Sequence, residues 1–236
     1  MVEQQGRLTL HLHILLWIAN SLSPQEMREK LKAGEDAFQT SLVDYLESVH
    51  TGDFLTGSME DVRKKVDADK LPLADRSNPT LLLPKMPPAL CKEIVCSGCS
   101  QCPSTLDWIQ HYKDEVDNLV LRSNVHKCRA SMKDLKDGSC AARFPRETYE
   151  YTTVDREDGH IFLKKNEPMM NTFSPALTYV MRSNTDVTSL LSGTAIKAVI
   201  AYVTDYITKQ SLKTHQLFST AYDVLMKKRD EAVNTN

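Results

Sequence analysis

Two histidines one residue apart, His11 and His13, are the first side chains along the chain whose spacing suggests chemistry. They fall in a run at 8–14 in which apolar and polar residues alternate, and this pattern predicts a β-strand. Residues two apart in a strand share one face, with their backbones about 7 Å apart, so one divalent ion can bridge the two imidazoles. The alternative is an incidental pair of surface histidines.

A third ligand for such an ion would have to come from another segment. Gly6 lies between Gln4-Gln5 and the alternating run, which predicts a turn that joins a preceding strand to this one. On that strand Glu3 is the nearest carboxylate, and Gln5 is a second candidate.

A second set of chemically capable side chains lies near the C-terminus. Tyr202, Tyr206 and Lys209 fall at i, i+4 and i+7, on the flank of a predicted helix at 195–209. The apolar stripe of that helix consists of Ile196, Val199, Ile200, Val203 and Ile207. A flank position lets a phenol reach a groove while its helix stays anchored. The alternative is that both tyrosines are half-buried packing residues.

Six cysteines form the third set. The spacing Cys96-x-x-Cys99-x-x-Cys102 is typical of one zinc knuckle. The residues that could complete a four-ligand site are His126 and Cys128, with Cys140 left over or as a substitute. Free buried thiols are the main alternative. The spacing Cys91-x4-Cys96-x2-Cys99 also resembles a plant-type iron-sulfur loop.

The composition limits what these residues can belong to. The chain has 236 residues, of which 41% are hydrophobic and 25% charged, so it can bury a real core. With 29 Lys and Arg against 31 Asp and Glu, any phosphate-binding site must be local. The longest apolar run, Leu12 to Ala19 with His13 inside it, is far shorter than the ~20 residues of a membrane helix.

Several elements can be predicted between these sets. Ser23-Pro24-Gln25-Glu26 is a capping box that opens a helix to about Leu31, and a second helix follows from about Glu35 to Val49. Ser104 predicts the start of another helix, Asp158-Gly159 a β-hairpin over 152–165, and the segment from Gly193 onward is helical in pattern. Five prolines between Asp67 and Leu90 indicate an extended connection.

Taken together and in their order along the chain, the motifs resemble those of a known protein family. The pattern at residues 5 to 17 is Gln-Gly-Arg-x-Thr-Leu-His-Leu-His-x-Leu-Leu-Trp, and residues 202 to 209 read Tyr-x-x-x-Tyr-x-x-Lys. Between them lie, in order, His126-x-Cys128, Cys140, Phe144-Pro145-Arg146, Asp158-Gly159, Asn171, Pro175 and Arg182-Ser-Asn184-x-Asp186. The chain resembles the helicase-like domain of Helitron rolling-circle transposons, of the fungal type. This domain is the replication-initiator part of the Helitron protein, an HUH endonuclease with two tyrosines.

The resemblance implies an activity and its residues. It implies a nuclease that nicks and transfers single-stranded DNA, with His11 and His13 as ligands of Mg²⁺ or Mn²⁺ and Tyr202 and Tyr206 as nucleophiles. Attack by a tyrosine would leave a 5′-phosphotyrosine and a free 3′-hydroxyl, which conserves bond energy for rejoining. Lys209 could favour phenolate at Tyr206 or neutralise a phosphate oxygen. The expected DNA contacts are Arg7, Arg182 and Lys197.

The fold expected from the resemblance is α+β. It has an antiparallel sheet with His-x-His on a central strand, flanking helices that include the tyrosine helix, and a cysteine-rich insertion. We expect four parts: 1–66 and 147–236 form the endonuclease domain, 67–90 is a proline-rich connection, and 91–146 is a Cys/His-rich helical insertion.

The expected partners are single-stranded DNA and the helicase domain of a full-length element. No G-x-x-x-x-G-K-[ST] motif occurs among the eight glycines, so we expect no ATP hydrolysis by this chain. Because residue 1 falls inside a predicted hairpin, we also expect a truncated domain with low activity. The alternative is an inactive transposon remnant that binds zinc or single-stranded DNA. We expect no secretion and no membrane span, and a nuclear location in a eukaryote or otherwise a cytoplasmic one.

Overall fold

The computed structural model describes residues 2–5, 9–16, 18–68, 79–92, 99–128, 140, 142–155, 157, 160–189, 197, 199–201 and 204. The chain divides into two compact units. One combines Met1–Pro24 with Leu190–Asn236, and the other is Gln25–Ser189. Each unit is described by itself below.

The first unit contains the predicted histidine hairpin. Strand β1 (Val2–Gln5) pairs antiparallel with β2 (Thr9–Leu12), which confirms that a preceding strand pairs with the histidine strand, while the turn expected at Gly6 lies outside the described residues. The register sets Glu3 directly opposite His11. The strand is shorter than the alternation suggested, because His13 already follows the end of β2. The described C-terminal residues of this unit, Lys197, 199–201 and Thr204, are helical, as predicted for that segment.

Three helices open the second unit. The first two, α1 (Pro24–Ala33) and α2 (Asp36–Val49), lie within two residues of the predicted bounds. The third, α3 (Met59–Ala68), was not predicted. It begins with a reciprocal cap, in which the Asp61 amide donates to the Ser58 hydroxyl at 3.2 Å and the Ser58 amide donates to the Asp61 carboxylate at 3.1 Å.

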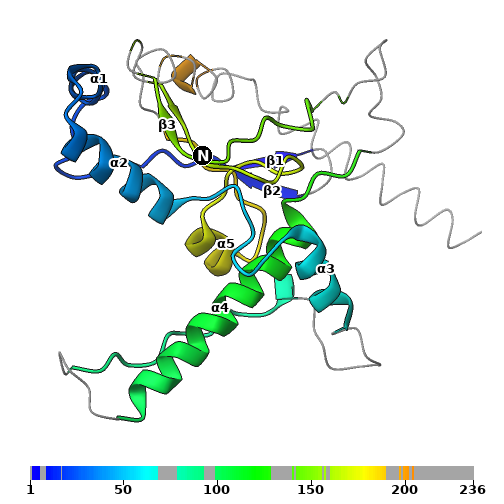
Figure 1. Ribbon diagram of the computed structural model, residues 1–236. Coiled ribbons are helices and arrows are strands. Elements are labelled where there is room, and N and C mark those ends of the chain that lie inside the picture. The colour runs from blue at the N-terminus through cyan, green and yellow to red at the C-terminus, as the bar shows by residue number, and fades with distance from the viewer. Residues whose placement is uncertain are drawn as a thin grey trace, which may run out of the picture. The chain divides into compact units, whose positions relative to one another are not determined.

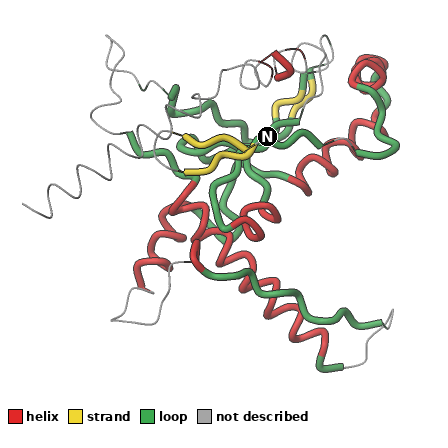
Figure 2. Tube along the Cα trace, turned by 180° about the vertical axis from the view of Figure 1, so that it is seen from behind, coloured by secondary structure: helices red, strands yellow, loops and turns green. Residues whose placement is uncertain are grey.

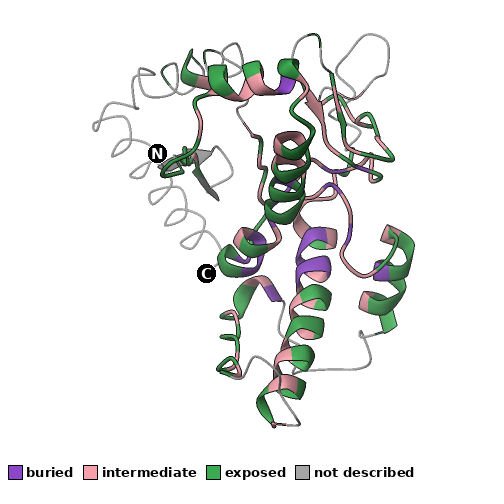
Figure 3. Ribbon diagram, turned by 60° about the vertical axis from the view of Figure 1, so that its left-hand side comes forward, coloured by how far each residue is buried: buried purple, intermediate pink, exposed green. Residues whose placement is uncertain are grey.

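Helix α4 (Gln101–Ser123) is the longest described helix of this unit, and other elements of the unit pack against it (Figure 1). It starts before the predicted cap at Ser104. Figure 3 shows that its C-terminal half carries the buried positions, and Val116, Leu119 and Val120 there are fully buried. Their i, i+3, i+4 spacing places all three on one face of the helix. The short 3₁₀-helix η1 (Pro79–Leu81) leads into an extended segment that runs alongside α4 (Figure 2).

The core gathers residues from four places around α4. Its buried members are Phe54, Val62, Val116, Val120, Met170, Phe173 and Tyr179. The last of these belongs to α5 (Pro175–Met181), a further helix that sequence did not predict, which is capped by Ser174. An isolated bridge between Thr51 and Phe173 ties the segment after α2 to this core.

The predicted hairpin at 152–165 is confirmed, although its strands are short. Strand β3 (Thr153–Val154) pairs antiparallel with β4 (Ile161–Phe162), and Tyr149 and Lys165 continue the pairing as an isolated bridge.

The expected α+β fold is wrong for the part of the chain that the structure describes. That part is mostly helical, with five α-helices, one 3₁₀-helix and two separate two-stranded hairpins. A two-stranded hairpin has two edges and no centre, so His11 lies on an edge strand and the expected central strand is not found there. The physical reason is that the described core is built from α3, α4, α5 and the loop segments around Phe54 and at 170–173, so none of its buried members comes from a strand.

One buried carboxylate fastens α4 to the segment before α3. Asp117 is 1% exposed and accepts hydrogen bonds from the Leu55 amide (2.7 Å), the Thr56 amide (2.8 Å) and the Thr56 hydroxyl (2.7 Å). Burial raises the pKa of Asp117, and these donors act in the opposite direction. The carboxylate therefore fixes residues 55–56 on the helix.

Replacing this carboxylate should be costly. Asp117→Ala leaves two backbone amides without their acceptor, and we expect a loss of about 3 kcal/mol of unfolding free energy. Urea unfolding followed by circular dichroism measures it. Asp114→Ala is the matched control, because the contacts of that exposed carboxylate in the described part are two exposed side chains, Gln110 at 2.9 Å and Lys65 at 3.5 Å. Its loss should change stability by less than about 1 kcal/mol. Equal losses in the two variants would contradict this role of Asp117.

Candidate metal centres

Three side chains from two separate segments meet just beyond the end of α4. His126 Nε2 lies 3.2 Å from the Cys128 sulfur and 3.2 Å from the Cys140 sulfur, and the three ligand atoms lie within 4.8 Å of one another. The His126 ring stacks on Phe144, with centroids 4.3 Å apart and planes 8° from parallel. We call this cluster of His126, Cys128 and Cys140 the His126 site.

The electrostatics of this site favour a thiolate. The Phe144 amide is the main cause that lowers the pKa of Cys140, burial acts in the opposite direction, and the Cys128 thiol and the amides of Ala142 and Arg143 lower the pKa further. Hydrogen bonds to a charged form stabilise it, and the thiolate is the form of cysteine that binds metals. The local backbone therefore prepares Cys140 to act as a ligand.

The two segments that carry these ligands are fixed on one turn. The His126 amide donates to the Met169 carbonyl at 2.7 Å, and the Arg146 amide donates to the neighbouring Pro168 carbonyl at 2.8 Å. Since Met170 follows directly and is fully buried, the turn is anchored in the core. The ligands are thus positioned by backbone contacts that do not involve their own side chains.

A second cluster lies at the other end of α4. The sulfur atoms of Cys91, Cys99 and Cys102 lie within 4.8 Å of one another, and those of Cys99 and Cys102 are 3.7 Å apart. All three side chains are half-buried. Cys102 belongs to the first turn of α4, and we call this set the cysteine cluster.

Cys91 reaches the cysteine cluster because the extended segment before it is fastened to the helices. The Lys85 carbonyl accepts from the Trp108 indole at 3.1 Å and from the Tyr179 hydroxyl at 2.9 Å. These two aromatic rings also contact each other, with centroids 6.0 Å apart in an edge-to-face arrangement. The backbone at 85 is therefore held on α4 and α5.

Both clusters could bind a metal ion such as zinc. In a tetrahedral zinc site with bonds of about 2.05 Å to nitrogen and 2.3 Å to sulfur, neighbouring ligand atoms are about 3.6 to 3.8 Å apart. The observed separations of 3.2 to 3.7 Å lie close to these values. A disulfide between Cys99 and Cys102 would need about 2.05 Å, so the 3.7 Å separation is that of two thiols.

The structure divides the cysteines differently from the sequence prediction. We predicted one site that combined Cys96, Cys99 and Cys102 with His126 and Cys128. Instead, Cys99 and Cys102 join Cys91, while His126 and Cys128 join Cys140, which we predicted to be left over or a substitute ligand. Cys96 lies outside the described residues. The pKa of Cys140 is lowered by contacts in the folded chain, and these contacts cannot be predicted from the spacing of the cysteines along the sequence.

The predicted catalytic residues are described only in part. Glu3 is paired with His11 in the hairpin register, and His13 is half-buried just beyond β2. Tyr202, Tyr206 and Lys209 lie outside the described residues. Their roles therefore stay predictions.

The predicted DNA contacts differ in their surroundings. Arg182 is 7% exposed, its guanidinium lies 2.9 Å from Glu115, and it covers the Tyr179 ring at 4.5 Å. Lys197 is exposed, and Arg7 lies outside the described residues. The contacts of Arg182 give it a structural task at the end of α5.

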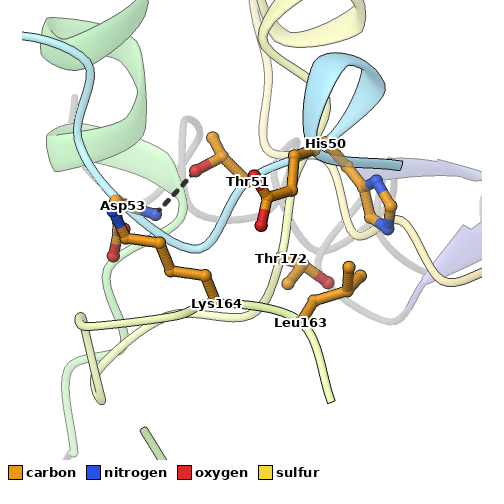
Figure 4. Close-up of a pocket in the computed structure, with 7 residues that line it drawn as sticks. His50, Thr51, Asp53, Leu163, Lys164 and Thr172 are labelled. Carbon is orange, nitrogen blue, oxygen red and sulfur yellow. Dashed lines mark hydrogen bonds between the residues drawn. The ribbon is translucent and has the colours of Figure 1, made fainter. Parts of the chain in front are cut away.

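A small polar cavity of about 170 Å³ lies between the segment after α2 and the segment after β4 (Figure 4). Its carboxylates already have partners, since Asp53 accepts from the Asn166 amide and side chain and Glu47 accepts from Thr152. Burial lowers the pKa of His50, whose Nδ1 faces the Leu46 carbonyl. The polar groups of this cavity therefore join two segments of the fold.

Comparison of the chain with protein-family models, with curated proteins and with solved structures finds no match. None of the helices in the described part has the length and apolar character needed to cross a membrane.

The two clusters are expected to bind zinc independently, because they share no ligand. Purified protein should contain two zinc ions per chain, measured by inductively coupled plasma mass spectrometry. Cys140→Ser should remove the ion of the His126 site, and Cys99→Ser should remove that of the cysteine cluster. Loss of both ions in either variant would favour one shared site, and a zinc-free protein would contradict both centres.

Proposed function

We propose that this chain is a metal-dependent endonuclease of the Helitron rolling-circle type, which nicks and transfers single-stranded DNA. The observation that carries the proposal is the register of the β1–β2 hairpin, which sets the carboxylate residue Glu3 opposite His11. Cross-strand neighbours lie about 5 Å apart at Cβ, close enough to share one ion. A donor set of one carboxylate and two imidazoles can hold a divalent ion, and the carboxylate suits Mn²⁺ or Mg²⁺.

The proposed reaction is a phosphoryl transfer, in which a DNA phosphate moves from a 3′ oxygen to a tyrosine oxygen. The Oη atom of Tyr202 or Tyr206 loses its proton to solvent and forms a bond to the phosphorus. The bond from phosphorus to the 3′ oxygen breaks, and the leaving oxygen takes up a proton from solvent. A phenol with a pKa near 10 is a weak nucleophile at neutral pH, so the site needs a cation that stabilises charge on the phosphate. A divalent ion on His11, His13 and Glu3 would supply it when bound.

Zinc has a separate, structural task in this proposal. We assign one zinc ion to the His126 site and one to the cysteine cluster, at opposite ends of α4. Each ion would join segments that α4 alone does not hold, and its binding free energy would be folding free energy. Neither ion takes part in the phosphoryl transfer.

The second candidate function is a zinc-binding module that holds single-stranded DNA without cutting it. The observation that favours it is the presence of two Cys/His clusters in the described residues. The two candidates differ in one respect, since only the endonuclease forms a covalent bond to DNA.

The test is a nicking assay on a fluorescent single-stranded oligonucleotide with Mn²⁺, followed by denaturing electrophoresis. We expect a covalent protein–DNA adduct that requires the metal. Tyr202→Phe/Tyr206→Phe should abolish the adduct, and His11→Ala should lower its yield by about 100-fold, in line with the effect of an electrostatic stabiliser.

Tyr151→Phe is the matched control, because that tyrosine is 70% exposed and its hydroxyl only contacts Glu150. It should leave the adduct unchanged. Zinc content should be the same in all variants. DNA binding without any adduct in the unaltered chain would replace the endonuclease by the second candidate.

A further inference from the structure

The loops that carry the His126 site also carry exposed cations. Lys127 lies between the ligands His126 and Cys128, and Arg143 follows Cys140 by three residues. Both side chains are exposed, and no ion pair joins either of them to a carboxylate in the part of the chain that the structure describes. These two cations are therefore free to meet a ligand from solution.

The backbone beneath both cations is fixed. The Arg143 amide donates to the Cys140 carbonyl at 2.7 Å, and Arg143 itself has φ of 60°, in the left-handed region. The residue before Lys127 is tied to the Met169 carbonyl. Rigid placement lowers the entropy that a charged side chain loses when it binds.

A third cation, Arg146, is half-buried and contacts the same aromatic ring as the metal-ligating histidine. Its guanidinium covers the Phe144 ring at 4.7 Å, on the ring that His126 also stacks against, and its Nε donates to Asn171 at 3.1 Å. Phe144 thus links the metal ligand to the arginine. We call Lys127, Arg143 and Arg146 the basic patch.

Lys127 and Arg143 are exposed cations on a chain whose net charge is −2. A zinc ion on one neutral imidazole and two thiolates is neutral, so the three cations of the basic patch are not offset by the metal centre. Glu147 is the exposed carboxylate next in sequence, and it accepts from the Tyr149 hydroxyl. Arg146 has further carboxylates near it, because the Asn171 side chain that accepts from it also donates to Asp186 at 2.8 Å, and Glu167 lies on the turn that its amide contacts. The cations of the basic patch that no described ion pair offsets are therefore Lys127 and Arg143.

We propose that the basic patch binds the phosphate backbone of single-stranded DNA, with the zinc of the His126 site as the support that holds it in shape. This inference rests on the proposed function, and it assigns the surface along which that substrate runs. Lysine and arginine contacts to phosphates are independent of sequence and weaken as salt rises, by a slope of about 0.7 per phosphate for a single strand. The basic patch makes no contacts to the bases in this proposal, so it binds single-stranded DNA without sequence specificity.

The experiment measures binding of a fluorescein-labelled 20-nucleotide oligo(dT) to the zinc-loaded chain by fluorescence anisotropy at several salt concentrations. Lys127→Gln/Arg143→Gln should weaken binding by at least about 10-fold and reduce the salt slope by about 1.4, which corresponds to two lost phosphate contacts. The matched control is Arg63→Gln/Lys113→Gln, which removes one exposed arginine and one exposed lysine from α3 and α4. We expect its affinity and salt slope to stay close to those of the unaltered chain.

Zinc content and circular dichroism verify that both variants are folded. Equal affinity in the two double variants, or no loss in either, would overturn the basic patch. The same titration on Tyr202→Phe/Tyr206→Phe separates this inference from the proposed function, because that variant should bind as tightly as the unaltered chain. If the unaltered chain forms no adduct but still loses affinity on Lys127→Gln/Arg143→Gln, the endonuclease fails and the basic patch stands.

Discussion

Two adjacent carbonyls of one turn set the geometry on which the described part of the second unit depends. The Met169 carbonyl accepts from His126 and the Pro168 carbonyl accepts from Arg146, so the chain after α4 and the chain before β3 are placed side by side. Met170 and Phe173 then leave the same turn and fill the core against α4. The packing of the core and the assembly of the three ligands of the His126 site therefore depend on the same turn.

Helix α4 extends the effect of this constraint over the length of the unit. At its C-terminal half Asp117 fixes residues 55–56 through three hydrogen bonds, and at its first turn Cys102 meets Cys91 and Cys99. A 23-residue helix is about 35 Å long, so the two clusters are far apart and must act as separate centres. Metals at both ends would hold segments that lack a large apolar face of their own.

The sequence was sufficient to predict those helices and hairpins that are specified by neighbouring residues. The Ser23-Pro24 start predicted α1, and the alternation around Gly6 and the Asp158-Gly159 turn predicted both hairpins. It failed where the answer depends on contacts between distant residues. The central sheet was wrong because a resemblance in motifs does not determine strand pairing, and α3 was missed although Ser58 and Asp61 form a local cap. The grouping of Cys140 with His126 depends on the turn at 168–169, which no spacing reveals.

The central claim is that these backbone contacts assemble His126, Cys128 and Cys140 into a site that can bind one metal ion. Zinc K-edge X-ray absorption tests it most directly, on a variant in which Cys91, Cys96, Cys99 and Cys102 are replaced by serine so that only this site remains. The account predicts one bound zinc with two sulfur neighbours at about 2.3 Å and a histidine nitrogen at about 2.0 Å. A zinc ion surrounded only by oxygen and nitrogen, or no bound zinc, would contradict it.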